Sequence, residues 1–429
     1  MKINSNNNLR ANILLLCITL FLCILIGELL LRSLKQPSNN NRNENGETIY
    51  LMSENFHHDY RPNQTFFKYP NNYDDFPPIK NEINSFAIRG PEIHPKRNNE
   101  YRVLLLGDSF LESEEVQYEE TVGQVLENIV DNKNFVVIQH GMSSWSPLLE
   151  LNWFNKKGIK LKPDIVILFL CINDFYSNYL RSDIHYEKET IFNDEGFPER
   201  FDIKIPLNQT KTRNVKYYYL YDLLERRFLL FDLLKNNINK LLKPKTNSLD
   251  QETINHLLIN DFDNFANYLE KILSDNSENI DIINDILRLA KPIDLWDSET
   301  KNSVETSLGY VDRFVNLAKQ NGIDIAITIV PFGWNISLEE EKIARRAYNF
   351  QDVIIPMGGI HNKILTYCKI NQVQYIDLYE SFKKYKINSN EKLFLIADGH
   401  WSPKGHEIVA KTINNIIFYN MEFQNNEIK

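Results

Sequence analysis

Residues 101–110 have the sequence YRVLLLGDSF, and this stretch decides the fold class. The run from Tyr101 to Leu106 is largely apolar and ends at Gly107, a pattern typical of a buried strand. A strand that is apolar at nearly every position is covered on both faces, as the strands of parallel sheets are. The stretch therefore predicts a buried strand followed by a tight turn that presents Ser109.

Strands and helices alternate along most of the chain after residue 98. Further strands are predicted at Phe135–Ile138 (FVVI), Asp164–Cys171 (DIVILFLC), Ile323–Pro331 (IDIAITIVP) and Val373–Leu378. Helices are predicted at Thr121–Val130, from Pro147, at Val311–Gln320, at Ile360–Cys368 and after Ser402-Pro403. Such alternation gives a parallel sheet with helices on both faces. The fold class is therefore predicted as α/β with a mainly parallel sheet.

The alternation stops between about residues 176 and 298, where Tyr217–Leu242 and Ile254–Leu289 have helical spacing. We interpret this region as a helical insertion. The linker that follows the N-terminal segment is polar and low in complexity, which favours flexibility. The chain thus divides into a membrane anchor at 1–35, a linker with an irregular arm at 36–97, and an α/β domain at 98–429 that contains the insertion.

The N-terminal stretch Ile13–Leu31 is almost continuously apolar, with Glu28 as its only charge. About 20 such residues span a bilayer as a helix, whereas a cleaved signal peptide has a shorter apolar region and a small-residue cleavage site. We therefore predict an uncleaved signal anchor that crosses the cytoplasmic membrane once and leaves the large domain outside the cytoplasm. The alternative is a buried hydrophobic helix. The flanking Lys and Arg residues orient the span only weakly.

The chain carries a formal net charge of −9 at pH 7. A general nucleic-acid binder needs a basic face, so this charge argues against that class. Among the four cysteines no CxxC pair occurs, and no His/Cys cluster has metal-ligand spacing, so no metal is predicted. Cys171 and Cys368 would be either buried thiols or a disulfide, and their spacing does not decide between these alternatives.

Two polar features follow predicted strands, at the edge of the sheet where ligands bind in open α/β folds. Ser109 belongs to a Gly-Asp-Ser turn, where its hydroxyl points outward and its own N–H can face an oxyanion. Taken alone, the tripeptide is more often an ordinary turn with an Asp–Ser cap. Asn173 follows the third strand and can donate its side-chain amide to the same oxyanion, although a lone Asn there is more often an Asx turn.

The third feature is the segment Asp398–His406, DGHWSPKGH. His400 is a candidate general base, and Asp398 is a candidate partner for its other ring nitrogen. Side chains at positions i and i+2 of an extended segment face the same side, so the carboxylate can reach the imidazole. The alternative is a capped helix start with two incidental histidines.

Together the three features have the order of a known family. The chain resembles the SGNH/GDSL hydrolase superfamily over about Arg102–Phe418, and more narrowly its bacterial membrane-anchored envelope members, which end in DGHWSPxGH. The segment Asn84–Gly90 (NSFAIRG) resembles an NSxGxR arm of those proteins, with Ala87 in place of glycine. The resemblance implies a flavodoxin-like three-layer α/β/α sandwich, the SGNH hydrolase fold.

The resemblance also implies roles for single residues. Ser109 would be the nucleophile, His400 the general base, and Asp398 the residue that orients the imidazole. Asn173 and the Ser109 N–H would be oxyanion donors. The usual Asn-x-Gly-x-x-Gly block departs from the pattern, because its second glycine is Ser144 here. Ser144 is the expected third donor through its backbone, with Gly141 as the alternative.

The chemistry implied by these roles is acyl transfer without a metal or organic cofactor. We expect a carboxylic ester hydrolase acting outside the membrane on an acylated carbohydrate or a small ester. The main alternative is an O-acetyltransferase that modifies an envelope polysaccharide. An alternative of another class is a catalytically silent binding or scaffold module in polysaccharide assembly. The remaining histidines are interpreted as surface or packing residues: His94, His140, His361 and His406.

Overall fold

The computed structural model describes most of one compact unit formed by residues 39–205 and 248–429. The described residues are 47–53, 56–69, 77–175, 187–192, 198–204, 287–340, 354–395 and 399–418, with a few isolated residues nearer the N-terminus. For 187–192 and 198–204 only the backbone is described.

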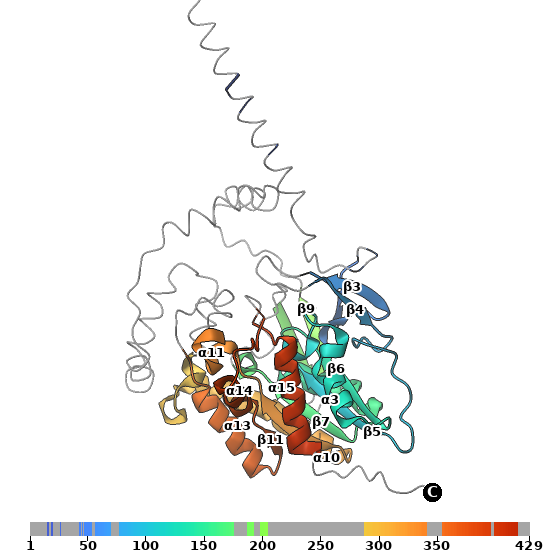
Figure 1. Cartoon of the computed structure of the whole chain (residues 1–429). Coiled ribbons are helices and arrows are strands. Elements are labelled where there is room, and N and C mark those ends of the chain that lie inside the picture. Colours follow the sequence, from blue (N-terminus) through green and yellow to red (C-terminus); the bar gives the residue numbers. More distant parts are fainter. Residues whose placement is uncertain are drawn as a thin grey trace, which may run out of the picture. The chain divides into compact units, whose positions relative to one another are not determined.

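A five-stranded parallel sheet forms the centre of the unit (Figure 1). Its strands are β5 (Tyr101–Gly107), β6 (Phe135–Gly141), β7 (Ile165–Leu170), β10 (Asp324–Ile329) and β11 (Gln374–Ile376). They lie in the order β6-β5-β7-β10-β11, and all neighbours are parallel. Counted along the chain this is order 2-1-3-4-5, the flavodoxin-like arrangement. The predicted strands and the α/β class are therefore confirmed.

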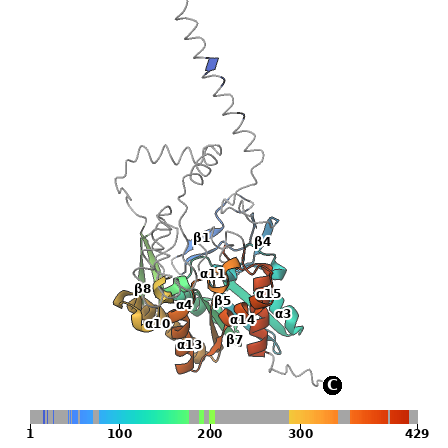
Figure 2. The same ribbon diagram turned by 60° about the vertical axis from the view of Figure 1, so that its left-hand side comes forward.

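Helices cover both faces of the sheet (Figure 2). On one face α3 (Val122–Val130) packs against α15 (Pro403–Ile413), which also contacts α14 (Leu378–Ile387). On the other, α4 (Pro147–Lys156) packs against α10 (Ser298–Gln320). The remaining helical segments are α2 (Ser109–Glu112), α11 (Gly333–Ile336), α13 (Gly358–Ile370) and the short turns at Tyr118–Glu120, Gly158–Leu161, Ile172–Phe175, Ile293–Leu295 and Asn414–Phe418.

The core follows from the apolar strands. Every residue of β7 is buried, as a strand covered on both faces requires. Between α4 and α10, the rings of Phe154 and Phe314 stack with centroids 4.4 Å apart, a ring pair that stabilises the helix contact beyond its buried area. Helix α10 begins well before the predicted Val311, because the Asp297 carboxylate accepts a hydrogen bond from Thr300 N at 2.7 Å and caps it.

The prediction of an irregular arm is wrong, because residues 47–97 (hereafter the arm) contain two antiparallel hairpins. Strand β1 (Tyr50–Ser53) pairs with β2 (His57–Tyr60), and β3 (Gln64–Lys68) pairs with β4 (Ile79–Ile83). In β4 the buried positions alternate, but the middle one is Asn81, whose side chain donates to Glu114 O at 3.2 Å. A polar residue at an inward position conceals the strand's period of two.

The predicted helical insertion also needs correction. Its first described part is an antiparallel hairpin of β8 (Glu187–Phe192) and β9 (Pro198–Lys204), not a helix. Both predicted helices of the insertion lie outside the described residues, apart from the last turn near residues 287–290.

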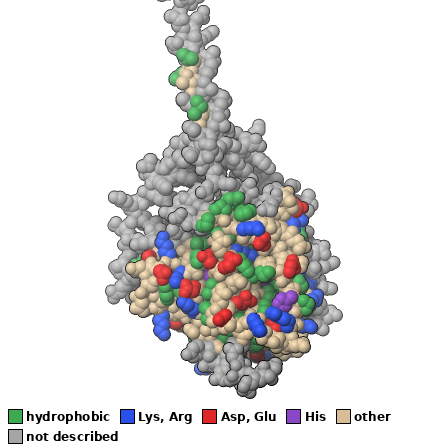
Figure 3. Space-filling model, turned by 45° about the vertical axis from the view of Figure 1, so that its right-hand side comes forward, with side chains coloured by type: hydrophobic (Ala, Val, Ile, Leu, Met, Phe, Trp, Pro, Cys, Tyr) green, Lys and Arg blue, Asp and Glu red, His purple; other side chains and the backbone are tan. Residues whose placement is uncertain are grey.

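The membrane anchor remains a prediction. Within the part of the chain that the structure describes, no helix is both long and apolar enough to cross a bilayer, and the predicted span at 13–31 lies almost entirely outside that part. Cys171 and Cys368 are both buried free thiols, so they form no disulfide with each other. On the face of the molecule shown in Figure 3, acidic and basic side chains of described residues are interspersed. A mixed face of this kind produces no strong field of one sign.

Gly90, at the end of the NSFAIRG segment, supplies a test of how the arm is fixed. Its φ is +117°, and an added Cβ would lie 2.5–2.6 Å from the Tyr118 ring. We expect Gly90→Ala to lower the free energy of unfolding by about 1–3 kcal/mol, because L-residues avoid this φ. The matched control is Gly309→Ala inside α10, where a Cβ meets nothing within 4 Å and should stabilise by roughly 0.5–1 kcal/mol. Urea unfolding measures both, and equal effects would show that the positive φ of Gly90 does not require glycine.

Candidate active site

Ser109 lies at the turn between β5 and α2, where the sequence predicted it. Asp108 caps the short helix, since its Oδ1 accepts a hydrogen bond from Phe110 N at 3.1 Å. Gly107 allows a close approach, because an added Cβ would lie 2.9 Å from Cβ of Phe169 on β7. Asp108 is 1% exposed whereas Ser109 is half-buried, so the turn directs the serine and not the aspartate toward solvent.

His400 contacts Ser109 directly. Its Nε2 lies 2.8 Å from Ser109 Oγ, a distance at which the hydroxyl donates to the unprotonated ring nitrogen. The two residues are far apart in the sequence, and no local pattern explains their meeting. A serine hydrogen-bonded to a histidine is the arrangement in which the imidazole can remove the hydroxyl proton during nucleophilic attack.

The loop that carries His400 is fixed by its backbone. Leu395 N donates to His400 O at 2.8 Å, and Ser402 N donates to Leu393 O at 2.9 Å. The Ser402 hydroxyl donates to Lys392 O at 2.7 Å and accepts from Gly405 N at 3.3 Å, which caps α15. The serine that was predicted as a helix cap therefore also ties the histidine loop to the preceding segment.

An aromatic shell holds the imidazole, and the sequence did not predict it. The rings of Phe110 and His400 meet edge to face with centroids 5.0 Å apart. Phe110 also lies 5.0 Å from the ring of Trp401, which is 1% exposed. Phe110 and Trp401 follow Ser109 and His400 in the sequence. Their rings pack on each other and so support the contact between Ser109 and His400.

Asn173 lies in the short helical turn directly after β7 and is half-buried. The turn is held by its neighbour Asp174, whose carboxylate accepts from Cys171 N at 2.6 Å. The Ser307 hydroxyl on α10 donates to Asp174 O at 2.7 Å, which links the turn to that helix. Because β5 and β7 are adjacent and parallel, Ser109 and Asn173 follow neighbouring strand ends on the same sheet edge.

The glycine block after β6 forms a β-turn at Met142–Trp145, closed by Trp145 N donating to Met142 O at 3.1 Å. Ser144 has a φ of +62°, while Ser143 has no positive φ, so the turn is of type II. Ser144 thus occupies a left-handed conformation that glycine adopts more readily. Gly141 has a packing reason to be glycine, since a Cβ would press on the backbone of Asp108 and Glu112.

Asp398 lies outside the described residues, so its role stays a prediction. The histidines interpreted as packing residues are placed as follows. His140 is buried and stacks on Trp153 at 4.4 Å, and His406 is buried against Trp401. His361 lies 3.4 Å from Asp377 at the β11 end, and the His94 side chain is about half exposed.

Three buried carboxyls, Asp108, Glu150 and Asp174, lie close enough together for their charges to interact, and this cluster was not predicted. Burial raises the pKa of Glu150 well above the ordinary carboxyl range, and the charge of Asp108 adds to it. Burial, Glu150 and Asp108 likewise raise the pKa of Asp174. Burial also raises the pKa of Asp108. The hydrogen bond from Phe110 N and the nearby His400 lower this pKa, but burial outweighs them. Neither Glu150 oxygen has a hydrogen-bond partner among the described residues.

These shifts predict that stability depends on pH. A carboxyl whose folded pKa is raised binds more protons in the folded state, so stability increases as pH falls toward the unfolded pKa. Buried His140 and His406 have lowered pKa values because of desolvation, and they oppose this only below about pH 6.5. Above about pH 6.5 these two histidines do not oppose the effect, so the raised pKa values of the carboxyls set its direction there.

We expect the free energy of unfolding to rise as pH falls from about 8 to 6.5. In Glu150→Gln the slope should be shallower by up to about 1.4 kcal/mol per pH unit, because the amide cannot take up a proton. Urea unfolding at several pH values within this window measures both slopes. Identical slopes in the two proteins would show that Glu150 does not titrate abnormally.

The arm contacts α2 and the residues that follow it through a buried polar cluster. The Tyr50 hydroxyl lies 3.1 Å from an oxygen of both Glu112 and Glu114, and Tyr60 donates to Glu114 at 2.8 Å. Burial raises the pKa of Glu112, and the charge of Glu114 adds to it. Burial opposes ionisation of Glu114 too, but Lys68 at 3.0 Å and Tyr60 outweigh it and lower its pKa.

Arg89 of the NSFAIRG segment makes a second link between the arm and this region. Its guanidinium is buried and donates to Ser113 O and, at 2.7 Å, to Val116 O. These carbonyls follow α2 directly. Ala87 of the same segment is left-handed with a φ of +65°. The segment therefore braces the chain that follows α2.

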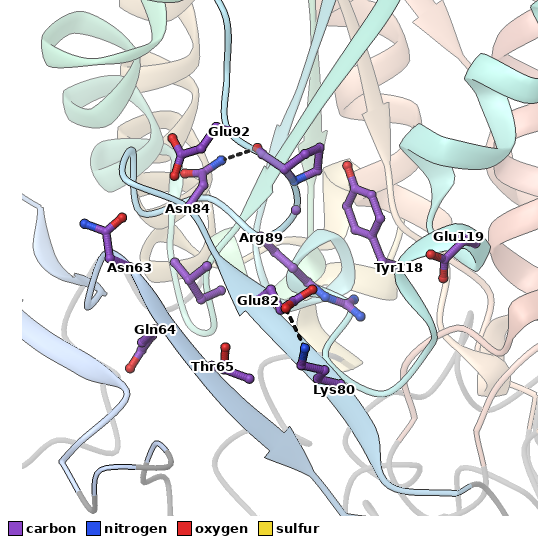
Figure 4. Close-up of a pocket in the computed structure, with 13 residues that line it drawn as sticks. Asn63, Gln64, Thr65, Lys80, Glu82, Asn84, Arg89, Glu92, Tyr118 and Glu119 are labelled. Carbon is purple, nitrogen blue, oxygen red and sulfur yellow. Dashed lines mark hydrogen bonds and ion pairs between the residues drawn. The ribbon is translucent and has the colours of Figure 1, made fainter.

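A cavity of about 550 Å³ lies beside the arm (Figure 4). Arg89, Tyr118 and the rim pair Lys80–Glu82 face it, and Asn84 is bonded to Pro91 O within its wall. Neither Ser109 nor His400 lines this cavity. Among the described residues no three His, Cys, Asp or Glu side chains gather to hold a metal ion.

No family model and no curated protein matches the chain. A GDSL-like lipase from Bacteroides thetaiotaomicron VPI-5482 matches at 10% identity over 75% of this chain and 90% of its own, with a TM-score of 0.33. The acetyl xylan esterase AlAXEase matches at 14% identity over 74% and 99%, with a TM-score of 0.34. The psychrotrophic esterase EstA from Pseudoalteromonas sp. matches at 11% identity over 76% and 100%, with a TM-score of 0.33. We infer neither fold nor activity from likenesses this distant.

Proposed function

We propose that this chain is a serine esterase that cleaves ester bonds through an acyl-enzyme on Ser109. The observation that supports this most strongly is the 2.8 Å contact between Ser109 Oγ and His400 Nε2 at the carboxyl edge of the parallel sheet. Both side chains are half-buried, whereas the residues that position them, Phe110 and Trp401, are buried. The reactive groups can thus meet a substrate while their supports stay fixed.

The proposed reaction has two halves. In the first, Ser109 Oγ attacks the ester carbonyl carbon while His400 takes the hydroxyl proton, and a tetrahedral oxyanion forms. The oxyanion accepts hydrogen bonds from the N–H groups of Ser109 and Ser144 and from the Asn173 amide. When the carbon–oxygen bond of the leaving group breaks, His400 gives its proton to the departing alcohol. The acyl group then remains on Ser109.

In the second half, His400 takes a proton from water, whose oxygen attacks the acyl carbon. The bond to Ser109 breaks, the carboxylic acid leaves, and His400 returns the proton to the serine. Asp398 is proposed to hold the second imidazole nitrogen during both halves. No step requires a metal or an organic cofactor.

For the substrate we propose the class expected from the sequence, an acylated carbohydrate or a small ester, most simply an O-acetyl ester. The proposed setting is the outer side of the cytoplasmic membrane, with residues 13–31 in the bilayer. The same acyl-enzyme would transfer its acyl group to a sugar hydroxyl if water were displaced, which is the transferase alternative.

The test is turnover of p-nitrophenyl acetate by the full-length protein, with and without an added alcohol acceptor. We expect p-nitrophenol release with acetate as the main product, and an acetyl ester on Ser109 in acid-quenched peptides. Release that depends on the added alcohol, with the acetylated alcohol as product, would favour the transferase. Unchanged p-nitrophenol release by Ser109→Ala would contradict the proposal.

A further inference from the structure

The turn that carries Ser144 N–H holds an orientation that its own sequence disfavours. In a type II turn the third residue has a φ near about +80°, whereas in a type I turn it is near about −90°. Ser144 stands at this position with a φ of +62°. A serine favours the type I alternative, because its Cβ is crowded in the left-handed region. Converting one turn type into the other reverses the direction of the central peptide group, which here consists of the Ser143 C=O and the Ser144 N–H.

His58, on β2 of the arm, contacts this peptide. Its Nε2 lies 2.7 Å from Ser143 O. A carbonyl oxygen only accepts hydrogen bonds, so His58 Nε2 carries a proton and donates. The histidine is 4% exposed, and its own carbonyl accepts from Trp145 Nε1 at 3.2 Å. This second hydrogen bond, from the last residue of the turn, therefore also holds His58 beside the turn.

Holding the carbonyl also fixes the amide, because C=O and N–H of one planar peptide point in opposite directions. We propose that His58 is a positioning residue that keeps the Ser143–Ser144 peptide in the type II orientation, so that Ser144 N–H faces the oxyanion. The role rests on the proposed function, since the donor matters only if an oxyanion forms at Ser109. His58 thus favours the left-handed conformation at position 144, which a glycine would adopt without such a contact.

The experiment compares His58→Ala in two backgrounds, with Ser144 and with Ser144→Gly, using full-length protein and p-nitrophenyl acetate. With Ser144 we expect kcat to fall about tenfold, since the left-handed serine no longer has its restraint. With glycine the same substitution should change kcat less than about twofold, because glycine populates a positive φ freely. His58→Gln, which keeps an N–H donor at similar reach, should retain most of the rate.

Asp59→Asn is the matched control for general damage to the arm. Asp59 neighbours His58 and forms an ion pair with Lys157 at 2.7 Å, but it does not touch the turn. This variant should leave kcat unchanged. An equal loss from His58→Ala in both backgrounds, or no loss with Ser144, would overturn the role of His58. Ser109→Ala in the same assay tests the proposed function separately, because unchanged turnover there would refute the site itself.

A crystal structure of His58→Ala gives a readout that needs no turnover. We expect the central peptide to be reversed, with a negative φ at Ser144, and to return to the type II orientation in His58→Ala/Ser144→Gly. A type II turn in the single variant would overturn the proposal.

Discussion

Replacing Ser109 by alanine should lower kcat/KM for p-nitrophenyl acetate by roughly 10³- to 10⁶-fold, because the variant lacks the atom that attacks the ester. His400→Ala should cause a loss of similar size, since its Nε2 is the group 2.8 Å from the serine hydroxyl. The double variant should be no worse than the worse single one. When two residues act as one unit, removing either of them abolishes the rate enhancement that both provide.

Ser113→Ala is the control for this series. Ser113 is buried at the other end of α2, and its hydroxyl donates to Phe110 O at 3.0 Å. Its loss removes a hydroxyl from the same short segment without touching His400, so the rate should stay within a few-fold of the parent. If Ser109→Ala and Ser113→Ala lose the same modest amount, the serine at 109 is not the nucleophile.

Trp401→Ala should destabilise the protein by about 3–5 kcal/mol and also lower kcat. The indole is 1% exposed and packs between Phe110, which follows Ser109, and Phe382 on α14. Removing it leaves a cavity that the surrounding rings cannot fill. It also removes the ring on which Phe110 packs. Phe110 then supports the His400 ring less well, so the hydrogen bond to Ser109 should loosen. Urea unfolding and turnover measured at a temperature where the variant stays folded separate the two effects.

Trp296→Ala provides the matched comparison. Trp296 is also buried, with its Nε1 bonded to Lys291 O at 2.9 Å, but it packs against Gly359 at the start of α13. Both tryptophan variants should lose stability by a similar amount, and only Trp401→Ala should lose kcat. Loss of kcat in both, in proportion to stability, would mean that Trp401 acts through folding alone.

The elements of the sheet could be predicted because their signal is local. Strand β7 is apolar at each position, and Ser402-Pro403 begins α15 as a capped helix does. The pairing of Ser109 with His400 was predictable only from the order of three motifs, since no single motif was specific. The departure at Ser144 was visible in the sequence, but its φ of +62° was not.

Other features depend on contacts between distant segments and leave no local pattern. The hairpin of β3 and β4 was missed because Asn81 occupies an inward strand position, where the Glu114 carbonyl accepts its hydrogen bond. The contact of His58 with Ser143 joins two segments that the sequence separates. Glu150 lies on a helix that the sequence predicted. Its burial could not be predicted, because acidic residues are seldom buried without a partner, and none is described for Glu150.

Covalent labelling of the full-length protein by a fluorophosphonate, followed by peptide mass spectrometry, shows directly whether Ser109 is a nucleophile activated by His400. We expect a single adduct on Ser109, formed quickly in the parent and at least about 10²-fold more slowly in His400→Ala, because the imidazole no longer removes the hydroxyl proton. An adduct on another residue, or labelling of Ser109 at the same rate without His400, would contradict a Ser109–His400 catalytic pair.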